Sequence, residues 1–246
     1  MRPKLALLHC RAQLRQNVRA PGIIVPALIF PAMFFVFFGM SAATDTFSAN
    51  LVLASYATYA FLGVVFNQFT GGVVEGRTGT WDEYLRTLPV SYSHRMLGWA
   101  LSGIVIGLLA FALVVVLALI LTDVDAGLSD WLFLSLAVLY GSVTMACFAS
   151  AVGYWFSPKV AAPVASLIYF GLTYAGAIWT APESLPGWLQ KVSPIIPTRM
   201  WAELAWSSIQ SAPWQTTHWL GLAGYTVLFG LFAVWGYRRD GHWRRS

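Results

Sequence analysis

Long apolar runs separated by short polar segments dominate the chain. Six of these runs are close to the 20 residues that a helix needs to cross the ~30 Å hydrocarbon core of a bilayer. They cover residues 23–40, 51–70, 96–121, 131–156, 160–180 and 217–237, and none contains Asp, Glu, Lys or Arg. Strands of a membrane barrel would alternate polar and apolar positions, which these runs do not. The pattern predicts an all-α integral membrane protein with six transmembrane helices.

The composition supports this fold class. Hydrophobic residues make up 58% of the 246 residues and charged residues only 10%, whereas soluble proteins carry about 25% charged residues. Ten acidic and fifteen basic residues are too few to cover the surface of a globular domain of this length. We therefore expect a single transmembrane domain over residues 1–246.

The basic residues predict the orientation of this domain. Most of them precede the first run, lie between the second and third or the fourth and fifth, or follow the sixth. These residues are Arg2, Lys4, Arg11, Arg15, Arg19, Arg77, Arg86, Arg95, Lys159, Arg238, Arg239, Arg244 and Arg245. By the positive-inside rule, both termini are cytoplasmic. We expect a multi-pass protein of a bacterial or archaeal cell membrane. This role explains the net charge of +5 better than nucleic-acid binding does.

The first run also fits a signal peptide loosely, because the small residues Ser41, Ala42 and Ala43 follow it. However, a signal peptide has an apolar core of about 7–15 residues, and residues 23–40 exceed that length. We expect the first run to be retained as a transmembrane helix.

The apolar runs lack the groups that several functions require. Ion-coupled carriers place ionisable side chains inside the membrane, and intramembrane hydrolases need a nucleophile with a base or a metal there. None of the lysines is followed by Ser or Thr, so there is no phosphate-binding loop. Cys10 and Cys147 fall at different membrane depths, which indicates neither a disulfide nor a metal site. The sequence therefore predicts a protein that is not an enzyme and binds no metal or cofactor itself.

Two runs carry a weakly polar face that is a candidate solute pathway. Its residues recur at steps of three and four, so they share one side of each helix. They are Ser55, Thr58, Tyr59, Phe66 and Asn67 in the second run, and Ser166, Tyr169, Thr173 and Gly176 in the fifth. An uncharged face of this kind suits a lipophilic or amphipathic solute. Hydrogen bonding between helices is the alternative role for the same residues.

The segment 71–95, between the second and third runs, is a candidate coupling site. Thr80 and Glu83 form a capping box for a short helix that Pro89 ends. This amphipathic helix would expose Asp82, Glu83 and Arg86.

The same segment resembles the permease subunits of ABC-2 type exporters, in particular the drug and antibiotic export permeases of the daunorubicin type. The resemblance lies in an acid, a base, a Gly-Thr pair, a Leu and a Pro that follow one another in this order: Glu75, Arg77, Gly79, Thr80, Leu85 and Pro89. It implies that this segment is a cytoplasmic coupling helix that docks into an ATP-binding subunit. Asp82, Glu83 and Arg86 would belong to the docking surface.

Two further segments are similar to parts of the same family. In residues 181–216, the chain is broken into short pieces by the prolines at positions 182, 186, 194 and 197, and Trp188, Trp201, Trp206 and Trp214 suit a membrane interface. The resemblance implies extracellular re-entrant helices there. In residues 1–21, Lys4, Arg11, Arg15 and Arg19 share one helical face, as expected for an amphipathic connecting helix on anionic lipid.

By this resemblance, the chain is the membrane-spanning subunit of an ATP-driven exporter that works by alternating access. It implies a second permease subunit, identical or related, and two copies of an ATP-binding subunit that hold ATP and Mg. A permease for polysaccharides or glycolipids is the alternative within the family. An ion-coupled carrier or channel that needs no ATPase is the alternative from another class.

Overall fold

The computed structural model describes residues 3–19, 21–78 and 92–243, and every regular element in these ranges is a helix. In chain order these are α1 (Pro3–Arg19), α2 (Pro21–Phe34), the π-helical η1 (Phe35–Gly39), α3 (Met40–Ala42), α4 (Thr46–Thr78), α6 (Tyr92–Leu121), α7 (Leu128–Trp155), α8 (Pro158–Ala175), the 3₁₀ turn η2 (Pro182–Ser184), α9 (Gly187–Val192), the 3₁₀ turn η3 (Ser193–Ile195), α10 (Pro197–Ile209) and α11 (Thr216–Trp243). The predicted fold class, an all-α integral membrane protein, is confirmed.

Five helical segments among the described residues are long and apolar enough to cross a membrane. They are Val25–Ala42, Thr46–Thr78, Leu97–Leu121, Leu128–Trp155 and Thr216–Asp240. The fifth predicted run corresponds to α8, which has 18 residues and includes Lys159 and Pro163, and it is not one of these five. A sixth crossing therefore stays a prediction.

Helix α8 ends at Ala175, five residues before the end of the predicted run. Ala177 adopts a left-handed conformation with φ of 55°. The N–H of Ile178 then donates to the carbonyl of Thr173 at 3.1 Å, and the N–H of Ala177 donates to that of Tyr174 at 3.0 Å. These two bonds are the Schellman motif that closes a helix.

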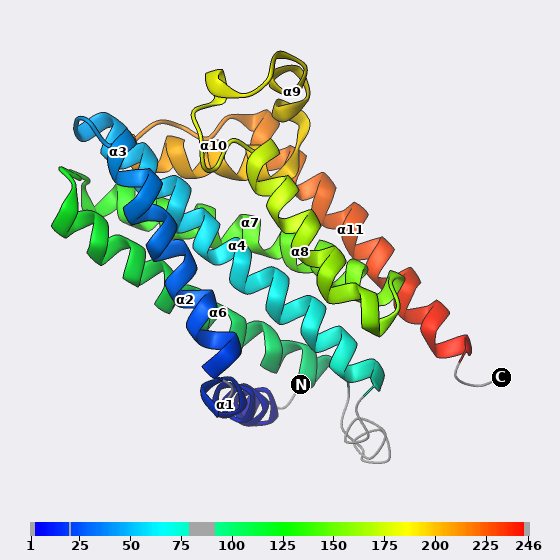
Figure 1. Ribbon diagram of the computed structural model, residues 1–246. Coiled ribbons are helices and arrows are strands. Elements are labelled where there is room, and N and C mark those ends of the chain that lie inside the picture. Colours follow the sequence, from blue (N-terminus) through cyan, green and yellow to red (C-terminus); the bar gives the residue numbers. More distant parts are fainter. Residues whose placement is uncertain (1–2, 20, 79–91, 244–246) are drawn as a thin grey trace.

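The bundle has two distinct ends (Figure 1). At one end lie α1, the last turns of α4 and the C-terminal end of α11, and we call it the basal end. At the other lie α3, α9 and α10, and we call it the capped end. Figure 1 shows α1 end-on below α2, so this helix runs across the direction of the long helices.

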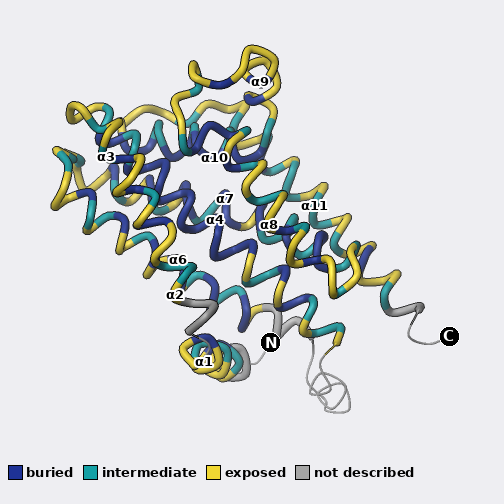
Figure 2. The backbone as a smooth tube through the Cα atoms, in the orientation of Figure 1, coloured by how far each residue is buried: buried dark blue, intermediate teal, exposed yellow. Residues whose placement is uncertain are grey.

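Helix α4 is the centre of the bundle, as the dark tube in Figure 2 shows. It packs against α2, α6, α7, α8 and α10, and each residue from Leu53 to Phe66 is buried. The helix is longer than the predicted run 51–70. Asp45 caps its N-terminus by accepting a hydrogen bond from the Ser48 N–H at 2.7 Å.

The C-terminal extension of α4 corrects the predicted boundary of the loop 71–95. Residues 71–78 form the last two turns of the helix. Gly72 is a packing site, since a Cβ there would lie 3.0 Å from the Trp99 ring of α6. Gly72 therefore serves close helix packing, and the pair Gly71-Gly72 does not begin a loop.

The capped end is fixed to the bundle by Trp201 of α10. Its side chain is wholly buried, and its indole N–H donates to the carbonyl of Ala137 in α7 at 2.9 Å. A Cβ on Gly141 would overlap the indole ring, so the absence of a side chain at Gly141 makes room for Trp201. Trp201 is therefore a core residue, whereas Trp188 of α9 is 69% exposed, and their position relative to a membrane interface stays a prediction.

Candidate functional site

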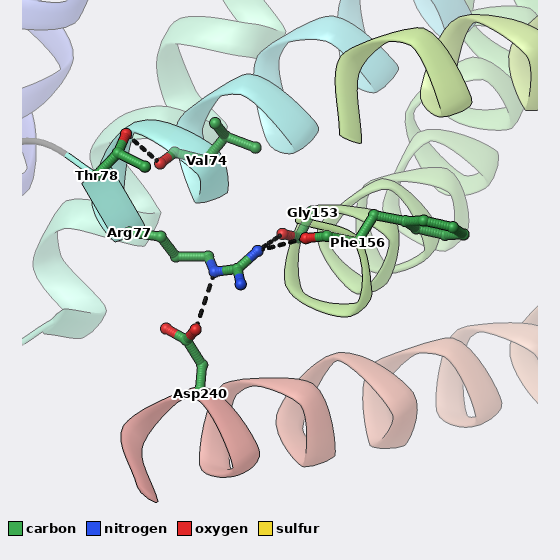
Figure 3. Close-up of polar contacts among 6 residues, drawn as sticks. All are labelled: Val74, Arg77, Thr78, Gly153, Phe156 and Asp240. Atoms are coloured by element: carbon green, nitrogen blue, oxygen red, sulfur yellow. Dashed lines mark hydrogen bonds and ion pairs between the residues drawn. The ribbon is translucent and has the colours of Figure 1, made fainter. Parts of the chain in front are cut away.

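The candidate coupling site is built around the last three turns of α4, residues 67–78, which we call the α4 base. Arg77 joins this base to two other helices (Figure 3). Its Nε forms an ion pair with Oδ1 of Asp240 in α11 at 3.0 Å. One terminal nitrogen donates to the carbonyls of Gly153 and Phe156, each at 2.7 Å. These carbonyls belong to the C-terminal end of α7, where a positive charge also interacts favourably with the helix dipole.

Close packing reinforces this connection between α4 and α7. A Cβ on Gly153 would lie 2.8 Å from Cβ of Val73, so the two helices approach closely. The hydroxyl of Thr70 donates to the carbonyl of Ala149 at 3.1 Å. The α4 base, the end of α7 and the end of α11 therefore form one packed unit.

Hydrogen bonds between side chains join the α4 base to α1. Glu75 is exposed and accepts a hydrogen bond from Nε2 of Gln16 at 3.0 Å. About two turns earlier in α4, Gln68 accepts a hydrogen bond from Asn17 at 3.4 Å. Movement of either helix along the other would break these contacts.

The same polar network extends from α1 and α4 to α6. Gln68 donates to the hydroxyl of Ser102 at 2.8 Å, and the indole N–H of Trp99 donates to Gln13 at 2.8 Å. A cavity of about 220 Å³ lies among these helices, and Asn67 is part of its wall. The buried face of α1 therefore carries amides, whereas Arg11, Arg15 and Arg19 are on its exposed side.

Of the predicted coupling residues, the structure describes Glu75 and Arg77. The predicted short helix lies outside the described residues, together with Gly79, Thr80, Asp82, Glu83, Leu85, Arg86 and Pro89. The contacts of Arg77 described above are with α7 and α11. The structure thus places Arg77 where it holds the α4 base together, and docking by this segment stays a prediction.

Four of the candidate pathway residues on α4 point into the bundle. Ser55, Thr58, Tyr59 and Phe66 are at most 7% exposed. Ser55 accepts a hydrogen bond from the indole N–H of Trp206 at 2.7 Å, and the hydroxyl of Thr58 donates to the carbonyl one turn earlier at 2.8 Å. Ser55 and Thr58 thus form hydrogen bonds inside the chain, and a lining role for the four residues stays a prediction.

The predicted faces of α4 and α8 do meet. The rings of Tyr59 and Tyr169 stack with centroids 5.5 Å apart and an angle of 15° between their planes. Phe66 lies against the same Tyr169 ring at 6.2 Å, and Phe34 of α2 and Trp179 extend the cluster on the other side of Tyr59. The structure brings together the aromatic members of the two predicted faces.

The remaining candidates on these faces divide into buried and exposed residues. Thr173 is buried and its hydroxyl donates to the carbonyl of Tyr169 at 2.7 Å, while Gly176 packs against the Thr198 side chain. Ser166 and Asn67 are exposed, and each donates to a carbonyl one turn earlier in its helix. A lining role for these residues stays a prediction.

Two residues that matter at the α4 base were missed in the sequence. Asp240 is an acid within an otherwise basic C-terminal segment, and that contrast is a signal for an ion pair. Asn17 belongs to a set of amides at positions 13, 16 and 17, a spacing that places them on one helical face. In the part of the chain that the structure describes, no group of three or more His, Cys, Asp or Glu side chains is arranged to hold a metal ion.

Comparison with known families gives a match over most of the chain. The model of the family described as ABC-2 type transporter matches residues 6–209, from α1 to the last residue of α10. None of the curated proteins matches the chain.

Proposed function

Because the chain belongs to the ABC-2 type transporter family, it is a multi-pass permease of an ABC transporter, and we propose that it exports a lipophilic or amphipathic small molecule. Permeases of this family are transport subunits rather than enzymes, and they normally work with an ATP-binding subunit. In our proposal two copies of that subunit hold ATP and Mg. A second permease chain, identical or related, completes the transporter.

The continuity of α4 is the observation that carries the proposal. This helix is unbroken from Thr46 at the capped end to Thr78 at the basal end. Residues 79–91 follow it directly, and these contain the predicted coupling helix. A force applied to that segment by an ATP-binding subunit would therefore act on the central helix of the bundle.

The contacts of the α4 base indicate how such a force would spread. Arg77 connects the base to α7 and α11, and Glu75 connects it to α1. A displacement of the base would carry these helices with it. We propose that this concerted tilt opens the permease alternately to the two sides of the membrane.

Exposed charges support a cytoplasmic location for the basal end. Arg11, Arg15 and Arg19 of α1 and Arg238 and Arg239 of α11 are all exposed near that end. Basic residues gather on the cytoplasmic side of membrane proteins. With this orientation, α9 and α10 cap the outer side.

The character of the α4–α8 contact supports an uncharged solute. The stacked pair Tyr59 and Tyr169 lies in a region where neither helix carries an ionisable acid or base. The exposed side of α8 next to it presents Phe170 and Tyr174, which are 46% and 41% exposed. Aromatic surfaces of this kind suit lipophilic or amphipathic compounds.

Reconstitution tests the proposal. The chain is placed in proteoliposomes with and without the ATP-binding subunit from the same source, and uptake of a lipophilic fluorescent dye into inside-out vesicles is followed. We expect accumulation only when both proteins and ATP–Mg are present. Dye movement by the isolated chain along a proton or sodium gradient would instead identify an ion-coupled carrier and refute the proposal.

A further inference from the structure

A groove on the membrane-facing surface is separate from the contacts described so far. It has a volume of about 500 Å³ and lies between α6 and α11. Phe61 and Val65 of α4 form its floor, and Gly103, Ala146 and Gly230 are among the small residues that leave it open. Only a few hydroxyls and one thiol are present in its lining, so it suits a hydrocarbon ligand.

The groove covers the depth of one leaflet. Along α7 its lining runs from Ser142 to Tyr154, a span of about 18 Å at 1.5 Å per residue. Tyr154 is next to the last residue of α7, so the groove begins at the basal end. Half of a ~30 Å hydrocarbon core is about 15 Å, which the groove matches.

The size of the groove distinguishes between a lipid chain and a protein helix. If a methylene group takes roughly the ~30 Å³ that a water molecule takes in the liquid, the groove holds on the order of 16 methylene groups. A helix of about 10 Å diameter and the same length would need on the order of 1400 Å³. One acyl chain fills the groove, whereas most of a helix of a second copy would lie outside it.

Positive charge lies at the basal end of this groove. Tyr154 and Tyr237 close that end with ring centroids 5.7 Å apart. Arg238 follows Val234 of the groove wall by four residues, so it lies on the same side of α11 one turn further on. Arg239 lies over the Trp155 ring at 5.1 Å, and the nearby acid Asp240 is paired with Arg77.

We propose that the groove between α6 and α11 binds one anionic phospholipid of the leaflet at the basal end. One acyl chain lies on Phe61 and Val65, and the phosphate is held by Arg238. This site is separate from coupling and from the solute pathway, and it does not depend on the proposed export function.

Native mass spectrometry of the full chain tests this site. The protein is transferred from nanodiscs of equal phosphatidylglycerol and phosphatidylcholine, with identical acyl chains, into a mild detergent. We expect wild type to retain one phospholipid, with phosphatidylglycerol preferred. Retention of no lipid, or retention without headgroup preference, overturns the proposal, and this result needs no variant.

Two glycines of α11 provide a matched pair of variants. Gly230→Leu places a side chain in the groove, where the nearest atom to a new Cβ is Sγ of Cys147 at 3.9 Å, so the variant is compatible with folding. Gly224→Leu adds the same side chain where a Cβ would meet nothing within 4 Å. We expect Gly230→Leu to weaken lipid retention about tenfold and Gly224→Leu to leave it unchanged. Ala146→Leu places a side chain in the groove from α7, and it replaces Gly230→Leu in this test if Gly230→Leu does not fold.

Two adjacent arginines test the headgroup contact. Arg238→Gln should reduce the preference for phosphatidylglycerol about fivefold, because one basic side chain near a lipid surface contributes about 1 kcal/mol. Arg239→Gln removes the same charge away from the groove and should keep the preference. Equal effects of the two variants overturn the assignment of the phosphate to Arg238.

Unchanged lipid retention in Gly230→Leu, with loss of dimers, would identify a second chain as the occupant of the groove and would also overturn the lipid proposal.

Discussion

Arg77 and Asp240 are 163 residues apart in the chain, and their side chains form an ion pair of 3.0 Å at the basal end. The guanidinium of Arg77 also caps the C-terminal end of α7 through the carbonyls of Gly153 and Phe156. One side chain of the central helix thus connects the ends of two others.

Loss of the Arg77 side chain should destabilise the bundle more than loss of the Asp240 charge. Arg77→Ala leaves a carboxylate and two carbonyls without this donor, and we expect a cost of about 2–4 kcal/mol. Asp240→Asn keeps the contacts with α7 and should cost about 1 kcal/mol. Thermal unfolding in detergent measures both. Arg15→Ala, which removes an exposed arginine of α1, is the control, and equal melting temperatures for Arg77→Ala and Arg15→Ala would contradict the assigned role.

Glu75 should be required for efficient coupling. In Glu75→Ala the hydrogen bond with Gln16 of α1 is lost, so α1 follows the α4 base less closely, through the contact between Asn17 and Gln68. We expect the number of solute molecules exported per ATP to fall several-fold while hydrolysis continues. Gln16→Ala should show the same defect, and the double variant should add little to either single one.

The control for this prediction is Glu183→Ala, which removes an exposed acid at the capped end. It should leave the ratio of export to hydrolysis unchanged. A normal ratio in Glu75→Ala would show that this connection does not transmit movement.

Gly141→Ala should displace α10 from the bundle. The new methyl group overlaps the buried Trp201 ring, and overpacking of this kind costs about 1–3 kcal/mol. Gly171→Ala adds the same group in α8, where a Cβ meets nothing within 4 Å, and we expect no loss of stability. Thermal unfolding compares the two variants, and tryptophan fluorescence should report a changed environment for Trp201 only in the first. Equal stability of the two variants would show that the capped end tolerates the displacement of α10.

Asp45 should give the capped end a small pH dependence. Hydrogen bonds from the side chain and the backbone of Ser48 lower the pKa of the Asp45 carboxyl below its usual 3.8. Because this pKa is lowered in the folded state, the ionised Asp45 side chain stabilises the N-terminus of α4 at neutral pH. This stabilisation is lost as the pH falls through the lowered pKa. Wild type should therefore exceed Asp45→Ala in stability at pH 7, and the difference should disappear in strong acid. Asp45→Asn keeps a capping oxygen that does not titrate, so its difference from Asp45→Ala should stay constant.

The sequence predicted those features that depend on composition and local pattern. The long charge-free runs predicted a helical membrane protein, and the prolines of residues 181–216 predicted the short helices of the cap. Predictions from the sequence were wrong where the role of a residue depends on tertiary packing. The predicted loop 71–95 begins at Gly71, yet residues 71–78 are helical, and the missing side chain of Gly72 leaves room for the Trp99 ring.

Contacts between residues that lie far apart in the chain could not be predicted from the local sequence pattern. Tryptophan is typical of membrane interfaces. Only the space left by the missing side chain of Gly141, 60 residues earlier, shows that Trp201 belongs to the core. The polar faces of the second and fifth runs were recognised from the sequence, and the structure adds that they meet at Tyr59 and Tyr169. Whether such a face packs or opens depends on the conformation, which helical periodicity does not encode.

The contact between α1 and α6 also has a consequence for biosynthesis. Gln13 receives its hydrogen bond from Trp99, 86 residues later in the chain. At about 5–20 residues per second, a ribosome needs about 4–17 s to synthesise the intervening segment. Over that interval α1 exists without its α6 partner, so this contact forms only late, after α6 has been synthesised.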